Sequence, residues 1–91
     1  MRRKYTNIFG EFIDLGGGNR VSPFQFRRFM NIVYLEGKIE AMATVKERYK
    51  NTEYHDRLNM DLFKAQRQLT DLTQNQDPDS LLKEMVNLSH K

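Results

Sequence analysis

The sequence predicts an all-α protein, organised as a helical hairpin or coiled coil with a short helix at each end. Apolar residues recur at spacings of three and four along most of the 91-residue chain, as on one face of a helix. Two polar–proline pairs, Ser22-Pro23 and Asp77-Pro78, have the composition of helix starts. Between residues 58 and 72, leucine and alanine repeat with the heptad spacing of a coiled coil.

A chain of 91 residues is long enough for a single small domain, and we assign residues 1–91 to one. Residues 1–21 are expected to form an N-terminal arm with a short helix and a glycine-rich hinge. Residues 22–75 are expected to form a long helix or a helical hairpin, and residues 77–89 a C-terminal helix.

The first helix is predicted from five apolar residues that share one helical side, Tyr5, Ile8, Phe9, Phe12 and Ile13. It must end at the glycine run 16–18, because glycine readily adopts the left-handed conformation that closes a helix. This run precedes another helix, but it lacks the lysine and the spacing of a nucleotide-binding loop, so we interpret it as a linker.

The second helix begins with the clearest start signal in the chain. Ser22 is placed to cap the helix, Pro23 takes the first helical position and Gln25 completes a capping box. The helix is expected to continue to Lys50 along an apolar face made of Phe29, Ile32, Leu35, Ile39, Met42, Val45 and Tyr49.

A second apolar stripe follows, and we call it the leucine seam: Leu58, Leu62, Ala65, Leu69 and Leu72. It is out of register with the preceding face, so the helix contains a stutter or the chain reverses at Asn51-Thr52. We favour the reversal, with Thr52 as the cap of a third helix, which makes residues 22–75 a hairpin.

Polar residues 74–76 are expected to form a loop, after which Asp77-Pro78 starts the last helix. Its apolar side consists of Leu81, Leu82, Met85, Val86 and Leu88.

The composition leaves little for catalysis. With no cysteine, the chain has no disulfide, thiolate nucleophile or cysteine-ligated zinc, and its two histidines are far apart in sequence. Glu36 and Glu40 are one helical turn apart, but each lies near bases, and we interpret them as solvated surface. We therefore predict a non-enzymatic protein without catalytic residues, a metal site or a cofactor.

Charge suggests an alternative function. The net charge is +3, but residues 1–50 carry ten bases and five acids, whereas residues 51–91 carry five bases and seven acids. Aromatic residues alternate with arginine around residues 24–29, as in some proteins that bind nucleic acids. Candidate contacts to an anion or nucleic acid are Arg2, Arg3, Lys4, Arg20, Arg27 and Arg28.

The leading prediction is a protein-interaction module. A stripe as narrow as the leucine seam usually packs against a single partner helix, so we predict the seam as the principal interface. The protein would be an oligomeric adaptor, a chaperone or a structural subunit, bound to itself or to a larger protein or nucleoprotein assembly. The sequence has no apolar run long enough to span a bilayer and no secretion signal, so we expect an intracellular, by default cytoplasmic, protein without a membrane partner.

Overall fold

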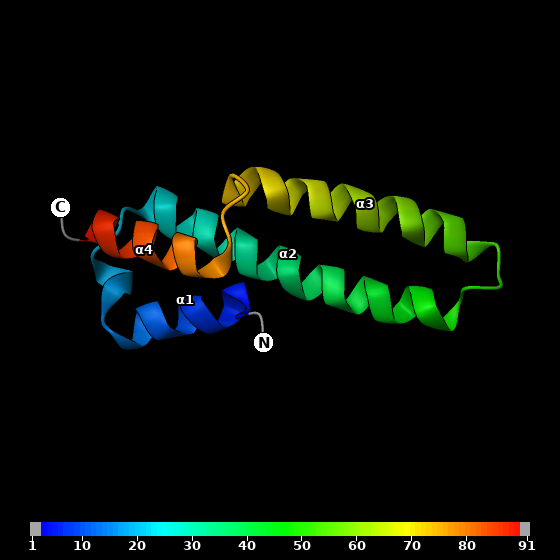
Figure 1. Ribbon diagram of the computed structural model, residues 1–91, viewed down its shortest axis with the longest axis horizontal. Coiled ribbons are helices and arrows are strands. Elements are labelled where there is room, and N and C mark those ends of the chain that lie inside the picture. Colours follow the sequence, from blue (N-terminus) through cyan, green and yellow to red (C-terminus); the bar gives the residue numbers. More distant parts are fainter. Residues whose placement is uncertain (1–2, 90–91) are drawn as a thin grey trace.

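The computed structural model describes residues 3–89 and has four α-helices in this range: α1 (Tyr5–Asp14), α2 (Pro23–Arg48), α3 (Tyr54–Thr73) and α4 (Pro78–Ser89). The described residues include no strand, which confirms the all-α prediction. α2 and α3 form an antiparallel hairpin, and α1 and α4 lie beside the N-terminal half of α2 (Figure 1). The molecule is elongated, with extents of 51 × 23 × 18 Å.

The chain reverses direction between α2 and α3, as the hairpin prediction requires. α2 ends at Arg48, two residues earlier than expected, because Tyr49 caps it through its N–H bonded to Val45 O and Lys46 O. The Thr52 hydroxyl donates to Tyr49 O (2.8 Å) and accepts from Tyr54 N (3.3 Å), so Thr52 supports the turn although Glu53 occupies the cap position. The rings of Tyr49 and Tyr54 meet edge to face, with centroids 6.1 Å apart.

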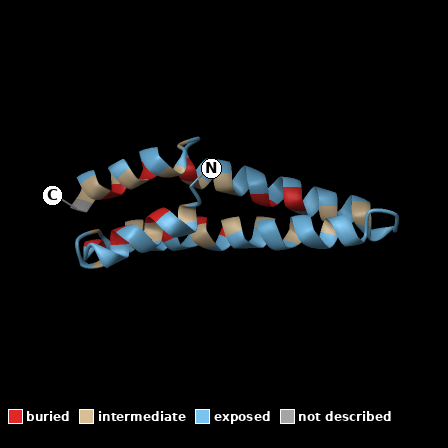
Figure 2. Cartoon of the chain, turned by 60° about the horizontal axis from the view of Figure 1, so that its bottom comes forward, coloured by how far each residue is buried: buried red, intermediate tan, exposed pale blue. Residues whose placement is uncertain are grey.

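The main core lies in the half of the molecule that contains α1 and α4 (Figure 2). Six side chains there are buried, two from each of α1, α2 and α4: Ile8, Phe12, Phe29, Ile32, Leu81 and Met85. Leu69 and Leu72 of α3 pack against this cluster. The predicted apolar sides of the first, second and fourth helices therefore meet one another.

The glycine run connects α1 to α2 by a tight, packed turn. Gly16 has a φ of 81°, a left-handed conformation that glycine adopts without a steric penalty. The short 3-10 helix η1 (Gly17–Asn19) follows, and Gly17 is buried so close to Phe12 that a Cβ atom would overlap the ring. The segment predicted as a hinge is thus packed against α1.

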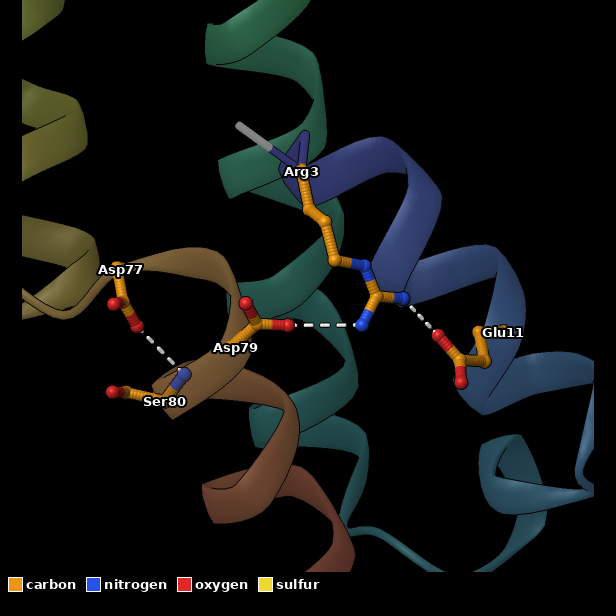
Figure 3. Close-up of polar contacts among 5 residues, drawn as sticks. All are labelled: Arg3, Glu11, Asp77, Asp79 and Ser80. Atoms are coloured by element: carbon orange, nitrogen blue, oxygen red, sulfur yellow. Dashed lines mark hydrogen bonds and ion pairs between the residues drawn. The ribbon is translucent and has the colours of Figure 1, made fainter. Parts of the chain in front are cut away.

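Both polar–proline starts cap their helices. Ser22 Oγ accepts from Gln25 N (3.2 Å), and Asp77 Oδ1 accepts from Ser80 N (2.7 Å; Figure 3). The capping box is incomplete, because the Gln25 side chain accepts a hydrogen bond from Arg28 instead.

Asp77 allows a prediction about pH. Its hydrogen bond from the Ser80 backbone holds the pKa of the Asp77 carboxyl below its ordinary value. Its stabilising effect is therefore complete above the unfolded-state pKa of about 3.9, and is lost as the pH falls through the lower folded-state pKa. We expect Asp77→Ala to lower the melting temperature at pH 7 and the gap from wild type to shrink in acid. Thermal melts across pH check this, with Asp77→Asn as the uncharged variant that keeps a cap. A gap unchanged in strong acid would contradict it.

The N-terminus of α1 is capped by a residue from another helix. Lys4 occupies the cap position and makes no capping hydrogen bond. Glu36 of α2 supplies the acceptor: its carboxylate receives hydrogen bonds from Tyr5 N (2.8 Å), Thr6 N (3.0 Å) and Thr6 Oγ1 (2.7 Å). The interpretation of Glu36 as solvated surface is wrong, because the half-buried carboxylate satisfies N–H groups that α1 cannot bond internally.

We expect Glu36→Ala to reduce the free energy of unfolding by about 2 kcal/mol, because it removes a charged cap and leaves backbone donors unpaired. Glu36→Gln should cost less, since its amide oxygen can still accept. Urea unfolding measures both variants. Glu47→Ala is the control: this glutamate is exposed and pairs only with Lys50, so its loss should stay within about 0.5 kcal/mol. Equal losses for Glu36→Ala and Glu47→Ala would contradict the capping role.

Candidate interaction surface

The leucine seam lies on the side of α3 that faces α2. Leu62 and Ala65 are buried, and Leu58, Leu69 and Leu72 are half-buried. The α2–α3 contact is the most extensive helix–helix contact in the fold. The partner helix that the narrow stripe requires is thus present in the same chain, and a contact with a second molecule through the seam stays a prediction.

The predicted basic residues are divided between paired and unpaired positions. Arg3 bridges Glu11 and Asp79, with 2.9 Å from Arg3 Nη1 to Asp79 Oδ1 (Figure 3), and Lys4 pairs with Glu40 at 2.9 Å. The hydrogen bonds to Glu11 and to Glu40 raise the pKa values of Arg3 and Lys4, respectively. These ion pairs neutralise two of the candidate anion contacts.

Arg28 is the most enclosed of the five candidates within the described residues, with a side chain only 12% exposed. Its Nε donates to Leu72 O (2.9 Å) and its Nη1 to Glu84 Oε1 (3.0 Å), so it links α2 to the end of α3 and to α4. Arg20 and Arg27 are exposed, and neither forms a side-chain hydrogen bond or ion pair within residues 3–89. Arg2 lies outside the described residues. The structure therefore does not gather the five described basic residues into one cluster.

The hairpin continues well beyond the helices that cover its base, and we call residues 41–65 the distal hairpin. The Lys4–Glu40 ion pair joins the α1 segment to the middle of α2. Of the helices in residues 3–89, only α2 and α3 extend beyond this point (Figure 1). Large apolar side chains are nevertheless exposed there, namely Val45, Tyr49, Tyr54, Met60 and Phe63, three of them by more than half. Two packed helices cannot bury all sides of both, so this surface is left to solvent or to a partner.

Three grooves are lined by residues of both α2 and α3. One of them has Lys46, Met60 and Phe63 in its lining. The other two share one side of the hairpin, which we call the open face. Its distal groove is lined by Val45, Tyr49, Tyr54, Arg57, Leu58 and Asp61. Its basal groove is lined by Asn31, Tyr34, Leu35, Gln68, Asp71 and Leu72. Tyr34 and Val45 are eleven residues apart, or about three turns, and therefore share one side of α2. Ile32 and Glu36 point the other way, into the core and toward α1.

The open face exposes aromatic rings that carry polar hydroxyl groups. Tyrosine combines a large apolar ring with a polar hydroxyl, which suits a surface that is wet when free and buried when bound.

Residues 3–89 contain no group of three or more acidic or histidine side chains that could hold a metal ion. In the same range, no helix has both the length and the apolar character needed to cross a membrane.

The spacing of apolar residues does not predict this surface, because it places Val45 and Tyr49 with the core-facing side of the second helix. That side rotates gradually around the helix, so Phe29 and Ile32 are buried whereas Val45 and Tyr49 are 39% and 45% exposed. A second set of apolar residues on the same helix could have indicated this surface. Met30 and Tyr34 lie outside the predicted apolar face and Val45 lies near its end, and the three residues follow one another at helical spacing.

Comparisons of the chain with protein-family models, with curated proteins and with solved structures give no match.

Proposed function

We propose that the protein is a non-enzymatic protein-interaction module that binds its partner through the open face of the α2–α3 hairpin. The observation that carries this proposal is the exposed apolar surface of the distal hairpin, above all Val45, Tyr49 and Tyr54. These side chains come from both helices and surround one groove. Their burial by a partner would remove apolar area from water, the usual driving force of protein association.

This proposal replaces the leucine seam by the open face as the principal contact. The seam already packs against α2, so its leucines stabilise the hairpin that presents the groove. The core that α2 forms with α1 and α4 then holds one end of the hairpin, and the distal hairpin presents the groove to a partner. An adaptor, a chaperone or a structural subunit would all use such a surface.

The test is affinity purification with the full chain as bait, followed by mass spectrometry. We expect specific proteins to be retained by wild type and lost with the double variant Val45→Glu/Tyr49→Glu. The control is Phe63→Glu, which also adds an acid at an exposed apolar position of the distal hairpin but lies outside both grooves of the open face. Retention of the same proteins by all three chains would overturn the proposal, provided circular dichroism shows equal helicity.

Nucleic-acid binding is the second candidate, supported by exposed Arg20 and Arg27, which have no ion pair within residues 3–89. Such binding should weaken steeply with salt, because each neutralised phosphate releases counterions. Arg20→Glu/Arg27→Glu should abolish it, while Val45→Glu/Tyr49→Glu should leave it intact. Electrophoretic mobility shifts over a salt series distinguish the two candidates.

A further inference from the structure

The charges of α2 are segregated onto two sides of the helix. Its acids Glu36 and Glu40 point toward the α1 segment, where they bond Tyr5, Thr6 and Lys4. Glu47 follows Glu40 by seven residues and therefore lies on nearly the same side. The side of α2 that belongs to the open face has basic residues instead. Arg27 lies seven residues before Tyr34, and Lys38 lies four residues after it. Arg48 lies three residues after Val45, so these three basic residues share the side of the two apolar ones.

The bases on the open face are not neutralised within the chain. Arg27, Lys38, Arg48 and Arg57 form no ion pair or side-chain hydrogen bond with any residue of the described range. Of the basic residues around α1 and α4, Arg3, Lys4 and Arg28 pair with acids, whereas Arg20 has no such partner within the described range. The α2 edge of the open face is therefore an uncompensated positive strip beside an apolar groove.

The α3 edge is different, because Asp61 lines the distal groove and Asp71 the basal groove. Arg57 is the base that this edge adds to the distal groove. A polyanion lying in the grooves would face both aspartates at close range, and its phosphates would gain nothing from Leu35, Leu58 or Val45. A protein helix can place acids on one flank only and apolar side chains toward the groove.

We infer that the open face binds an amphipathic helix of a partner protein that carries acidic residues along one flank. This inference rests on the proposed function and names the chemistry of the partner. The paired length of the hairpin follows from α3, whose 20 residues extend about 30 Å. An occupant of about 20 residues would lie along both grooves, with its apolar stripe on the tyrosines and its acidic flank against Arg27, Lys38 and Arg48.

A second copy of the chain fits this surface less well. If two open faces came together, each would contribute four unpaired basic residues to the interface. Each would contribute only two acidic residues from the groove linings, Asp61 and Asp71. Like charges placed together across an interface disfavour association, whereas an acidic flank is complementary to the α2 edge. Charge complementarity thus selects a heterologous partner.

The experiment uses synthetic helical peptides of one design, with leucine at the a and d positions and either glutamate or lysine on one flank. Binding to the full chain is followed by fluorescence anisotropy at low and high salt. We expect the glutamate peptide to bind at least about tenfold more tightly than the lysine peptide, and less tightly as salt rises. Lys38→Glu/Arg48→Glu should reverse this preference. Arg67→Glu/Lys83→Glu changes the net charge equally but lies off the open face and should preserve it.

Several outcomes would overturn the inference. Equal binding of both peptides, or an unchanged preference in Lys38→Glu/Arg48→Glu, would show that the basic strip does not select the occupant. Displacement of the glutamate peptide by single-stranded oligothymidylate would assign the surface to nucleic acid. A dimer in sedimentation velocity that Val45→Glu converts to a monomer would assign it to a second copy. If neither peptide binds while Val45→Glu/Tyr49→Glu still loses its cellular partners, the acidic-helix inference fails and the proposed function stands.

Discussion

Replacing Phe29 by alanine is expected to reduce the free energy of unfolding by about 3–5 kcal/mol. Phe29 is 1% exposed and belongs to the core where α1, α2 and α4 meet. Alanine would leave a cavity among Ile8, Ile32 and Leu81, which sit on helices that cannot all move inward to fill it. A domain of 91 residues has a free energy of unfolding of about 5–14 kcal/mol, so the variant loses a large share of it.

Urea unfolding followed by circular dichroism measures this effect. Phe24→Ala is the matched control, because Phe24 lies on the same helix one and a half turns earlier but is 77% exposed. Its substitution should change the free energy of unfolding by no more than about 0.5 kcal/mol. Similar losses in the two variants would mean that the cluster around Phe29 is not the main core.

Leu62→Glu is expected to have the second large effect, and it tests the role of the leucine seam. Leu62 is only 9% exposed and lies on the side of α3 that packs against α2. Glutamate would lose the apolar burial of leucine and place a carboxylate in the packed contact between α2 and α3, for a combined cost of about 3 kcal/mol or more. We expect the distal hairpin to separate and the helical content to fall.

The neighbouring substitution Phe63→Glu supplies the control, since Phe63 is 64% exposed and should tolerate the charge. Thermal melts at several protein concentrations, combined with sedimentation velocity, distinguish the two roles of the seam. If the seam is intramolecular, Leu62→Glu lowers the melting temperature equally at every concentration and leaves the sedimenting mass unchanged. A concentration-dependent loss of an oligomer would instead support the seam as an interface between molecules.

Much of the fold could be predicted because its signals are local. The Ser22-Pro23 and Asp77-Pro78 caps depend on hydrogen bonds to N–H groups three residues later, so a few neighbouring residues determine where these helices begin. The change of register after Tyr49 predicts the reversal for the same reason, because a single straight helix cannot keep both stripes on one side.

The candidate site could not be predicted in the same way. A narrow stripe such as Leu58–Leu72 is compatible with a helix from the same chain or from another, and the sequence pattern is identical in both cases. In the tertiary structure this stripe packs against α2, whereas Val45, Tyr49 and Tyr54 are exposed on the distal hairpin.

The sequence by itself determined the all-α class, the capped starts at Ser22-Pro23 and Asp77-Pro78 and most of the apolar side of each helix, because these follow from periodicity and from contacts within one or two turns. Only the tertiary structure decided what each side chain faces. Glu36 caps a helix that begins 31 residues earlier, and Arg28 bonds residues 44 and 56 positions away. Such pairings depend on how the helices pack, and packing brings together groups whose separation along the chain carries no periodic signal.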